Sequence, residues 1–471
     1  MTAAVIYWTR RDFRLSDNPA LSAACASGAS VIPVFLCDEG VEGLAAAPRW
    51  RLGLGAEAFA VRLAGAGSRL ICRRGPALQV LRALIAETGA VAVHWNRLYD
   101  PESRRRDEAV KAALKAEGIK AVSHAGHAVH EPWTVETGTG GFYKVYTPFW
   151  KAVRGRDVEA PLPVPRLAVP EIWPGSEVIA DWGLGHAMNR GADVVLAHCK
   201  IGEAAAQDRL EAFVTDRIGD YSDARDRLDV DGTSSLSENL TYGEISARTC
   251  WHAGMRALVA GKPGAETFLK ELIWRDFAYH LVHHTPHITS RNWREEWEGF
   301  AWNTDADHPH VQAWMRGRTG LPVVDAAMRE MYVTGRMHNR ARMLVASYLT
   351  KHLLTHWKIG MDWFAECLVD WDPASNAMGW QWSAGSGPDA TPYFRVFNPE
   401  TQAEKFDPLG RYRRAFVAEI SGKPPKTALS YFRAIPRSWD MGPGDPYPGA
   451  PVVSAADGRK RALEAYENRG F

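Results

Sequence analysis

The chain has 471 residues and carries 56 Lys and Arg against 55 Asp and Glu, which leaves a formal net charge of +1. A balanced charge excludes a protein that binds nucleic acid through an overall basic surface, so such binding has to come from a local patch. The 19 tryptophans are unusually many, and they indicate large cores or flat ligands on which indoles stack.

Short apolar runs alternate with helical patterns over the first 130 residues. Runs at 4–9, 30–36, 69–72, 90–95 and 119–124 predict buried strands, and the segments between them have helical spacing. One of these helices starts at "SDNPAL", with Asp17 or Asn18 as the N-cap and Pro19 in the first turn. This alternation is typical of a parallel doubly wound sheet, so we predict an α/β domain over residues 1–130.

The character of the sequence changes after residue 130. Residues 131–202 are rich in Pro and Gly and predict an interdomain linker. From residue 203 onward the patterns are helical, with long helices predicted over 203–218, 265–284, 321–335 and 338–357. We therefore predict an all-α domain over residues 203–471.

Cysteine usage and the absence of long apolar runs suggest a location. The six cysteines form no CxxC motif, which indicates reduced thiols rather than a disulfide framework. The N-terminal "MTAAVIYWTRRDFRLSD" lacks the apolar run of a signal peptide, and no stretch approaches the length of a membrane span. We expect a cytoplasmic protein without membrane contact.

A polar stretch, "DGTSSLSENLTYGEIS" at 231–246, leads into a predicted helix. Hydroxyls of Thr233, Ser234 and Ser237, with backbone N–H groups of 234–236, are suited to hold a phosphate at a helix start. When such a stretch occurs without other supporting motifs, an N-cap loop that binds no ligand is more frequent than a phosphate-binding loop.

One predicted helix, 265–284, places Glu271, Trp274 and Arg275 on one face. These residues indicate either a polar cleft with a stacking ring or a surface ion pair beside a core tryptophan. Further along, His280 and His284 have the spacing of a helical ligand pair, but no acidic third ligand accompanies them, so we expect no metal site.

The stretch "NAMGWQWSAG" at 376–385 fits neither a helix core nor a strand, because it combines an amide, two indoles and small residues. It follows Asp370 and Asp372, and "GRMHNRARM" precedes both with Asn339 and Met343 one turn apart. Acids, arginines, an amide and indoles therefore gather in the predicted helical domain.

Over essentially its whole length the chain resembles the photolyase/cryptochrome family. The resemblance is carried by "WTRRDFRLSDNPAL", "DGTSSLSENLTYGEIS", "ELIWRDF", "TGLPVVDAAMREMYVTGRMHNRARM" and "DWDPASNAMGWQWSAGSGPDATPYFRVFNPETQAEKFDP", in the family's order. It implies an antenna-type α/β domain and a helical domain that holds FAD, with reduced FADH⁻ as the active form.

The resemblance assigns a role to each motif. FAD contacts are implied for Tyr221, Thr233, Ser234, Ser235, Leu236, Ser237, Arg342, Asp370, Asp372 and Asn376. Of these, Asn376 would face the flavin N5, and the Arg342–Asp370 pair would lie across the isoalloxazine. An electron relay is implied for Trp380, Trp357 and Trp302, in that order from the flavin.

The substrate contacts follow in the same way. Glu271, Trp274, Asn339 and Met343 match the pocket for a cyclobutane pyrimidine dimer, and Arg225, Arg275, Arg340 and Arg395 match positions near the DNA backbone. Asn339 and Met343 stand where animal-type six-four enzymes carry a histidine pair, and the cysteines of the iron–sulfur subfamily are missing. The resemblance thus implies light-driven repair of cyclobutane pyrimidine dimers by a deoxyribodipyrimidine photolyase acting on UV-damaged DNA, and we expect a monomer.

Two departures from the family pattern and two alternative functions accompany this expectation. Ser235 stands where the family commonly has an arginine, so the phosphate loop lacks a cation. Glu102 and Ser103 replace the Asn–Glu pair of folate-binding members; we still expect methenyltetrahydrofolate as antenna, with Trp133 or Glu136 near it, against the alternative of an empty pocket.

One alternative function is a blue-light signalling cryptochrome, which need not keep the complete dimer pocket. A nucleotide-binding hydrolase or transferase is the other rival, and it lacks a phosphate motif in the first domain.

Overall fold

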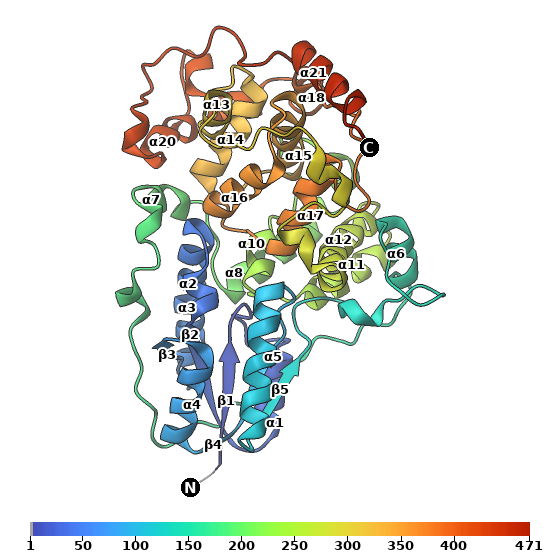
Figure 1. The fold of residues 1–471 in the computed structure, drawn as a ribbon. Coiled ribbons are helices and arrows are strands. Elements are labelled where there is room, and N and C mark those ends of the chain that lie inside the picture. The colour runs from blue at the N-terminus through green and yellow to red at the C-terminus, as the bar shows by residue number, and fades with distance from the viewer. Residues whose placement is uncertain (1–2) are drawn as a thin grey trace. The chain divides into compact units, whose positions relative to one another are not determined.

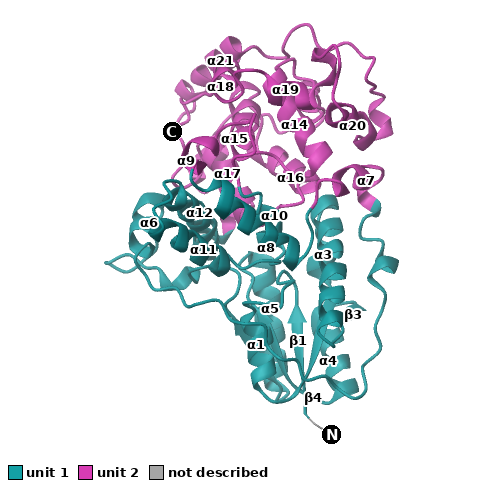
Figure 2. Cartoon of the chain, turned by 180° about the vertical axis from the view of Figure 1, so that it is seen from behind, with its two compact units in different colours: residues 1–186, 200–219, 234–286 teal, residues 187–199, 220–233, 287–471 magenta. Residues whose placement is uncertain are grey.

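The computed structural model describes residues 3–471, which form two compact units (Figure 2). Unit 1 comprises residues 1–186, 200–219 and 234–286, and unit 2 comprises residues 187–199, 220–233 and 287–471. These units are cut at other places than the predicted domains 1–130 and 203–471, so the predicted boundaries stay a prediction.

Unit 1 contains a parallel sheet of five strands, as predicted (Figure 1). The strands are β1 (Ala4–Thr9), β2 (Ser30–Cys37), β3 (Ile71–Arg74), β4 (Ala90–Asn96) and β5 (Lys120–His124), in the order β3-β2-β1-β4-β5. The third strand begins two residues later than the predicted run at 69–72. Since the strand order reverses between β1 and β4, their carboxyl ends form the switch point of a doubly wound sheet.

Helices cover both faces of this sheet. On one face α1 (Pro19–Ala26) and α3 (Ala46–Gly65) pack against Val5 and Tyr7, and on the other α4 (Ala77–Thr88) and α5 (Pro101–Ala116) pack against Ile6 and Trp8. Neighbouring residues of β1 thus point to opposite cores, as the twofold period of a strand requires. Of the two predicted caps of α1, Asn18 is the one that accepts a hydrogen bond, from the Leu21 N–H at 3.1 Å.

The rest of unit 1 is helical. Its elements are α2 (Glu39–Glu42), α6 (Tyr146–Val153), α8 (Glu203–Ala212), α10 (Ser237–Thr241), α11 (Ala247–Val259) and α12 (Ala265–His284). Helix α6 lies inside the segment that we predicted to be a linker. It is ordered because Tyr146, Phe149, Trp150 and Val153 form a buried stripe at helical spacing.

Unit 2 is entirely helical apart from loops and one isolated bridge between Asn303 and Thr355. Its α-helices are α7 (Gly191–Leu196), α9 (Tyr221–Ala224), α13 (Pro309–Met315), α14 (Pro322–Thr334), α15 (Asn339–Ser347), α16 (Trp357–Cys367), α17 (Pro373–Ala384), α18 (Pro399–Phe406), α19 (Arg411–Phe416), α20 (Lys426–Ala434) and α21 (Ala455–Glu467). Together with unit 1, this confirms the predicted fold class.

The prediction of one helix over 338–357 is wrong. Helix α15 ends at Ser347, a π-helical turn follows at Tyr348–His352, and Leu354 then has a left-handed φ of 49°. The chain turns because His356 caps a new helix: its Nδ1 accepts a hydrogen bond from the Lys358 N–H at 3.2 Å. Helical spacing of apolar residues continues through the break, so the sequence pattern does not reveal it.

Candidate active site

The predicted site residues are divided between the two units. Unit 1 holds Ser234, Ser235, Leu236, Ser237, Glu271, Trp274 and Arg275. Unit 2 holds Tyr221, Arg225, Thr233, Trp302, Asn339, Arg340, Arg342, Met343, Trp357, Asp370, Asp372, Asn376, Trp380 and Arg395. The contacts within each unit show what supports these residues.

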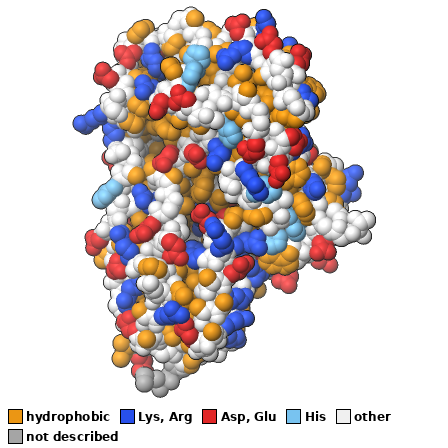
Figure 3. Space-filling view, in the orientation of Figure 1, with side chains coloured by type: hydrophobic (Ala, Val, Ile, Leu, Met, Phe, Trp, Pro, Cys, Tyr) orange, Lys and Arg blue, Asp and Glu red, His pale blue; other side chains and the backbone are white. Residues whose placement is uncertain are grey.

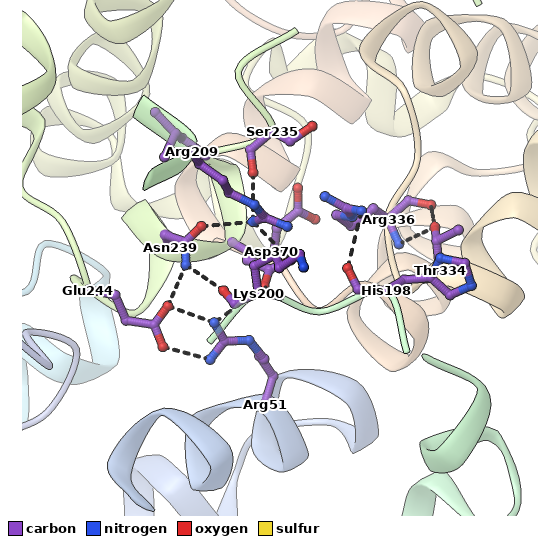
Figure 4. Close-up of polar contacts among 12 residues, drawn as sticks. Arg51, His198, Lys200, Arg209, Ser235, Asn239, Glu244, Thr334, Arg336 and Asp370 are labelled. Atoms are coloured by element: carbon purple, nitrogen blue, oxygen red, sulfur yellow. Dashed lines mark hydrogen bonds and ion pairs between the residues drawn. The ribbon is translucent and has the colours of Figure 1, made fainter. Parts of the chain in front are cut away.

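The predicted phosphate loop precedes the short helix α10. Ser235 has a left-handed φ of 53°, and its carbonyl accepts a hydrogen bond from Arg209 Nη1 at 3.0 Å (Figure 4). Arg209 comes from α8 and also donates to Asn239 Oδ1 at 2.8 Å. The loop has no arginine of its own, but Arg209 supplies a guanidinium to it from another helix. No local sequence pattern around position 209 predicts this role.

A buried ionic network continues from this loop to α3. Arg51 donates to Glu244 at 2.9 and 2.7 Å and lies 3.3 Å from Glu238, and all three side chains are fully buried. Asn239 donates to Glu244 and to the carbonyl of Lys200 (Figure 4). Because the facing carboxylates favour the charged guanidinium more than burial disfavours it, the pKa of Arg51 is raised.

Helix α12 carries the unit 1 part of the predicted dimer pocket. The Trp274 indole stacks on the Tyr146 ring, with centroids 3.6 Å apart and planes 10° from parallel. The Tyr146 hydroxyl is held in turn by the carbonyl of Lys270 at 2.5 Å. Tyr146 thus covers one face of the indole and orients it, while Trp274 and Glu271 remain only partly buried.

Arg275, predicted to lie near the DNA backbone, has partners inside unit 1. Its guanidinium donates to the carbonyl of His127, contacts the His127 ring nitrogen at 2.9 Å and donates to the carbonyl of Leu240 at 3.2 Å. These contacts give Arg275 a structural role in joining α12 to the segment that follows β5. Its contact with a phosphate stays a prediction.

In unit 2, residues on α15 and α17 form the part predicted to face the flavin. Arg342 Nη2 binds both oxygens of Asp370, at 2.9 and 2.7 Å, and its Nε donates to the carbonyl of Met337. Asp372 caps α17 by accepting the Ser375 N–H at 2.8 Å. The predicted ion pair of Arg342 and Asp370 is therefore formed.

Asn376 lies on α17, and its side-chain amide is oriented by a neighbouring helix. Its Nδ2 donates to the carbonyl of Met361 on α16 at 3.0 Å. This bond uses one of the two N–H donors and fixes the amide, so its carbonyl oxygen can accept a hydrogen bond from a ligand. An acceptor at this position suits the N5–H of a reduced flavin.

The three predicted relay tryptophans all belong to unit 2. Trp357 is fully buried, and its Nε1 donates to Asn292 at 2.8 Å. The His356 ring lies between the next two members, 5.4 Å from Trp357 and 5.9 Å from Trp302 between centroids. Trp380 is buried beside Phe364 of α16, with ring centroids 4.9 Å apart. The His356 ring thus contacts the rings of both Trp357 and Trp302, and the relay itself stays a prediction.

The remaining predicted contacts of unit 2 differ in exposure. Asn339 begins α15 and is exposed, and Met343 lies one turn further on the same face. Arg340 is paired with Asp226 at 2.6 Å, whereas Arg395 is exposed. The Arg225 guanidinium lies 5.8 Å from the ring of the buried Tyr221.

Unit 1 also contains a pocket of about 270 Å³ near the end of the sheet. Its lining includes Trp95, Arg97, Tyr99, Arg104, Asp107, Glu108, Lys111, Trp133 and His283. The Trp133 indole is 41 % exposed, with Arg97 5.3 Å and the His283 ring 5.5 Å from its centroid. Burial lowers the pKa of His283 to about 4, so its ring is neutral at physiological pH. The aromatic walls make this pocket suitable for a planar ligand, and its cations stand beside carboxylates, with Arg97 paired to Glu131 at 3.0 Å.

Other features of the described residues limit the chemistry. Over residues 3–471 no cluster of three or more His, Cys, Asp or Glu side chains could hold a metal ion, and no helix there is long and apolar enough to cross a membrane. Acidic and basic side chains are mixed on the face shown in Figure 3, which fits the balanced net charge.

The residues present fit an FAD cofactor. The loop 234–237 offers hydroxyls and N–H groups at a helix start for a diphosphate. Asn376 offers an oriented acceptor, and the Arg342–Asp370 pair offers a flat charged surface. Each unit thus offers groups suited to part of a flavin nucleotide, and the contacts of these residues with FAD stay a prediction.

Known proteins resemble the chain along its whole length. Two family models match it: DNA photolyase over residues 5–166 and the FAD binding domain of DNA photolyase over residues 268–468. A deoxyribodipyrimidine photo-lyase of Agrobacterium fabrum is 43 % identical over 99 % of this chain and 98 % of its own. The crystal structure of a bacterial class III photolyase from Agrobacterium tumefaciens has a TM-score of 0.90 at 41 % identity, covering 100 % of this chain and 98 % of that one. An archaeal photolyase from Sulfolobus tokodaii, crystallised with two FAD molecules and described as implying a novel light-harvesting cofactor, has a TM-score of 0.79 at 28 % identity, covering 99 % of this chain and 100 % of that one.

Proposed function

The chain belongs to the DNA photolyase family, and on that basis we propose how its residues carry out the light-driven repair of cyclobutane pyrimidine dimers in DNA. It is an FAD-dependent lyase of the deoxyribodipyrimidine photo-lyase type. The observation that carries the proposal is the presence of Glu271, Trp274, Asn339 and Met343, the residues that the resemblance assigns to the dimer pocket, in a chain similar to such an enzyme over 99 % of its length.

When bound, reduced FAD supplies an electron on absorbing light and receives it back after the dimer has opened. The protein has to bind the flipped-out dimer, keep water away and stabilise the added charge. Trp274, held by Tyr146 on one face, offers its other face to a pyrimidine ring. Glu271 would hydrogen-bond a dimer carbonyl, and Met343 would pack beside the dimer.

The flavin must be reduced before it can repair, and we propose that Trp380, Trp357 and Trp302 deliver the electrons. Indoles can be oxidised by an excited flavin, and a relay needs them closely spaced. The ring of His356 between Trp357 and Trp302 supports such a path. Asn376 would place its carbonyl oxygen at the flavin N5.

The antenna is proposed to be methenyltetrahydrofolate in the pocket beside Trp133. A pterin would stack on the exposed indole, and Arg97, Arg104 and Lys111 would attract the glutamate carboxylates. The Nδ1 of His283 is buried and has no hydrogen-bond partner among the described residues, so it is suited to a polar edge of the ligand. Neither Glu102 nor Ser103 lines the pocket, in keeping with a binding mode other than that of the usual Asn–Glu pair.

The switch point of the sheet is less suitable for an antenna. Arg10 is paired with Asp107 at 2.8 Å and Arg106 with Asp38 at 3.1 Å, and both guanidinium groups lie over the Trp8 ring. Parallel sheets usually bind ligands at this edge. Here the protein's own ion pairs occupy it, which favours the Trp133 pocket.

The enzyme is tested by repair. Protein reduced chemically in the dark is mixed with an oligonucleotide that contains a thymine dimer, and repair is measured with and without light. We expect repair only in light. If reduced protein that retains FAD shows none, the proposal is wrong and the alternative of a blue-light receptor is favoured.

The relay is tested separately with Trp380→Phe. We expect this variant to reduce oxidised FAD slowly in light, while chemically reduced variant still repairs. Normal photoreduction by the variant would exclude Trp380 from the relay.

The antenna is tested by adding methenyltetrahydrofolate to the purified protein and to Trp133→Ala. Excitation of the bound folate is expected to drive repair in the parent and not in Trp133→Ala, whereas Glu102→Ala, outside the pocket, behaves as the parent. Equal folate binding by Trp133→Ala would refute this site.

Damaged DNA is the proposed partner, and a monomer in the cytoplasm remains the expectation from the sequence.

A further inference from the structure

Helices α16 and α17 of unit 2 meet at two side chains that the proposed function uses. Asn376 and Trp380 lie one turn apart on α17 and therefore face the same way. The Asn376 amide donates to the carbonyl of Met361, and the Trp380 indole lies on the neighbouring residue, Gly360. Two consecutive residues of α16 thus contact both functional side chains.

Gly360 makes this contact possible because it has no side chain. A Cβ at position 360 would lie 2.6 Å from Cζ2 of Trp380 and closer still to Cη2 and Cζ3. Gly360 is the fourth residue of α16 and its φ is outside the left-handed region, so the backbone itself does not require glycine here. Glycine inside a helix is unfavourable relative to alanine, which points to close packing as the reason for this residue.

The same helix also carries the second relay tryptophan. Trp357 lies three residues before Gly360 and is fully buried, with its Nε1 held by Asn292. The backbone of α16 therefore connects the fixed indole of Trp357 to the surface on which Trp380 lies. Trp380 itself is 2 % exposed and packed between Phe364 and Trp314, so it has little room to move aside.

We propose that Gly360 is a positioning residue for light-driven reduction of the flavin. Gly360 sets the position of the Trp380 indole relative to Trp357, and together with Met361 it sets the position of the Asn376 amide. This inference rests on the proposed relay and deepens it. Gly360 touches no reacting atom, and it acts through the close approach of two helices.

The contact is tested first without light. Thermal unfolding midpoints are measured for the parent, Gly360→Ala, Trp380→Phe and the double variant. We expect Gly360→Ala to lower the midpoint by several degrees, because overpacking a core displaces its neighbours. In the Trp380→Phe background, which lacks Cζ2, Cζ3 and Cη2, the same alanine should cost less than half as much.

The control is Gly379→Ala. Gly379 directly precedes Trp380 on α17, is exposed, and a Cβ there would meet no atom within 4 Å. It changes the same helix by the same methyl group without touching the indole. Its midpoint is expected to equal or exceed that of the parent.

Photoreduction gives the second measurement, on protein that retains FAD. We expect the initial rate of flavin reduction in light to fall about tenfold or more in Gly360→Ala, since ångström-scale displacements of reacting groups reduce rates on this scale. Gly379→Ala should match the parent. Repair by chemically reduced Gly360→Ala should continue, since that reaction does not use the relay.

The outcomes separate this inference from the proposed function. If the parent neither photoreduces nor repairs, the proposed function is wrong. If the parent photoreduces and Gly360→Ala does so equally fast and is as stable, the inference is overturned and the function stands. If Gly360→Ala fails to fold, the double variant decides: recovery of folding supports the contact with Trp380, and an equal failure overturns it.

Discussion

At the scale of single residues, partners distant in the sequence determine what each predicted side chain can do. Trp274 is oriented by Tyr146, and Asn376 by the carbonyl of Met361. Arg275 is tied to His127, which restricts the reach of its guanidinium toward a phosphate. The identity of a residue thus indicates a chemistry, and its neighbours decide how it is used.

Glu271 separates repair from sensing. Glu271→Ala is expected to lower the quantum yield of repair by up to about tenfold, because without this hydrogen bond the electron returns to the flavin more often before the dimer opens. This loss is smaller than the roughly 10²-fold fall in rate that follows removal of an oxyanion-hole donor. Glu271→Gln keeps a hydrogen-bond donor and should retain more activity. The measurement is single-flash repair by chemically reduced protein, with DNA affinity determined on the same samples.

Glu266→Gln is the control for Glu271, because Glu266 lies on the same helix in a surface pair with Lys270. It should repair as the parent does. If Glu271→Ala also repairs normally, Glu271 is structural.

His280 couples stability to pH. Its Nδ1 contacts the carbonyl of Pro132 at 2.9 Å and its Nε2 accepts the Tyr143 N–H at 3.1 Å, an arrangement that needs a neutral ring. Burial lowers the pKa of His280 to about 4, so the folded protein binds this proton less readily than the unfolded chain. The stabilisation is present above about pH 6.5 and is lost as the pH falls toward 4, by at most about 3 kcal/mol.

The measurement is the free energy of unfolding between pH 7 and pH 4. His280→Gln cannot titrate, so it should lose less stability over this range than the parent, although it is less stable at pH 7. The exposed His186, changed to Gln, should follow the parent curve. Parallel curves for the parent and His280→Gln would contradict the assignment.

At the scale of elements, short segments depend on longer ones. The loop 234–237 leads into α10, a helix of only five residues, and is held by Arg209 from α8 and by the Arg51 network from α3. Such a short helix is not stable alone, because nucleating a helix is unfavourable. Its geometry, and with it any diphosphate site, therefore comes from its neighbours.

Arg209→Ala is expected to weaken FAD binding by about tenfold or more, because the carbonyl of Ser235 and the side chain of Asn239 lose a charged hydrogen-bond partner. FAD affinity is measured by titrating flavin into the apoprotein. Arg256→Ala, an exposed change on α11, is the control. Unchanged affinity in Arg209→Ala would show that the loop holds its shape without this arginine.

At the scale of the whole molecule, the charge balance constrains DNA binding. With a net charge of +1, affinity has to come from a few arginines, and each phosphate contact contributes about one unit to the dependence on log salt concentration. The mixed charges visible in Figure 3 fit binding through few contacts.

Arg395→Ala should reduce the slope of log affinity against log salt concentration by about one unit, because Arg395 is exposed. It should weaken the binding of damaged and undamaged DNA equally. Arg340→Ala should have a smaller effect, since Asp226 already neutralises its guanidinium at 2.6 Å. The slope is measured by titrating DNA at several salt concentrations, with the exposed Arg437→Ala as control. An unchanged slope in Arg395→Ala would exclude its phosphate contact.

Much of this protein could be determined from the sequence alone. The alternation of apolar runs predicts the parallel sheet, helical spacing predicts α12 and α14, and the long motifs indicate the family and the flavin. These features depend on residues close together in the chain, since a strand or a helix buries its own periodic face.

Only the tertiary structure decided which side chains support the site. The cation beside Ser235 comes from α8, the ring behind Trp274 comes from a segment predicted to be a linker, and the break after Ser347 interrupts a continuous helical pattern. The sequence alone does not indicate that Gly360 contacts the Trp380 indole, which only the structure shows. Local spacing cannot reveal such contacts, because they join residues that only packing brings within a few ångströms.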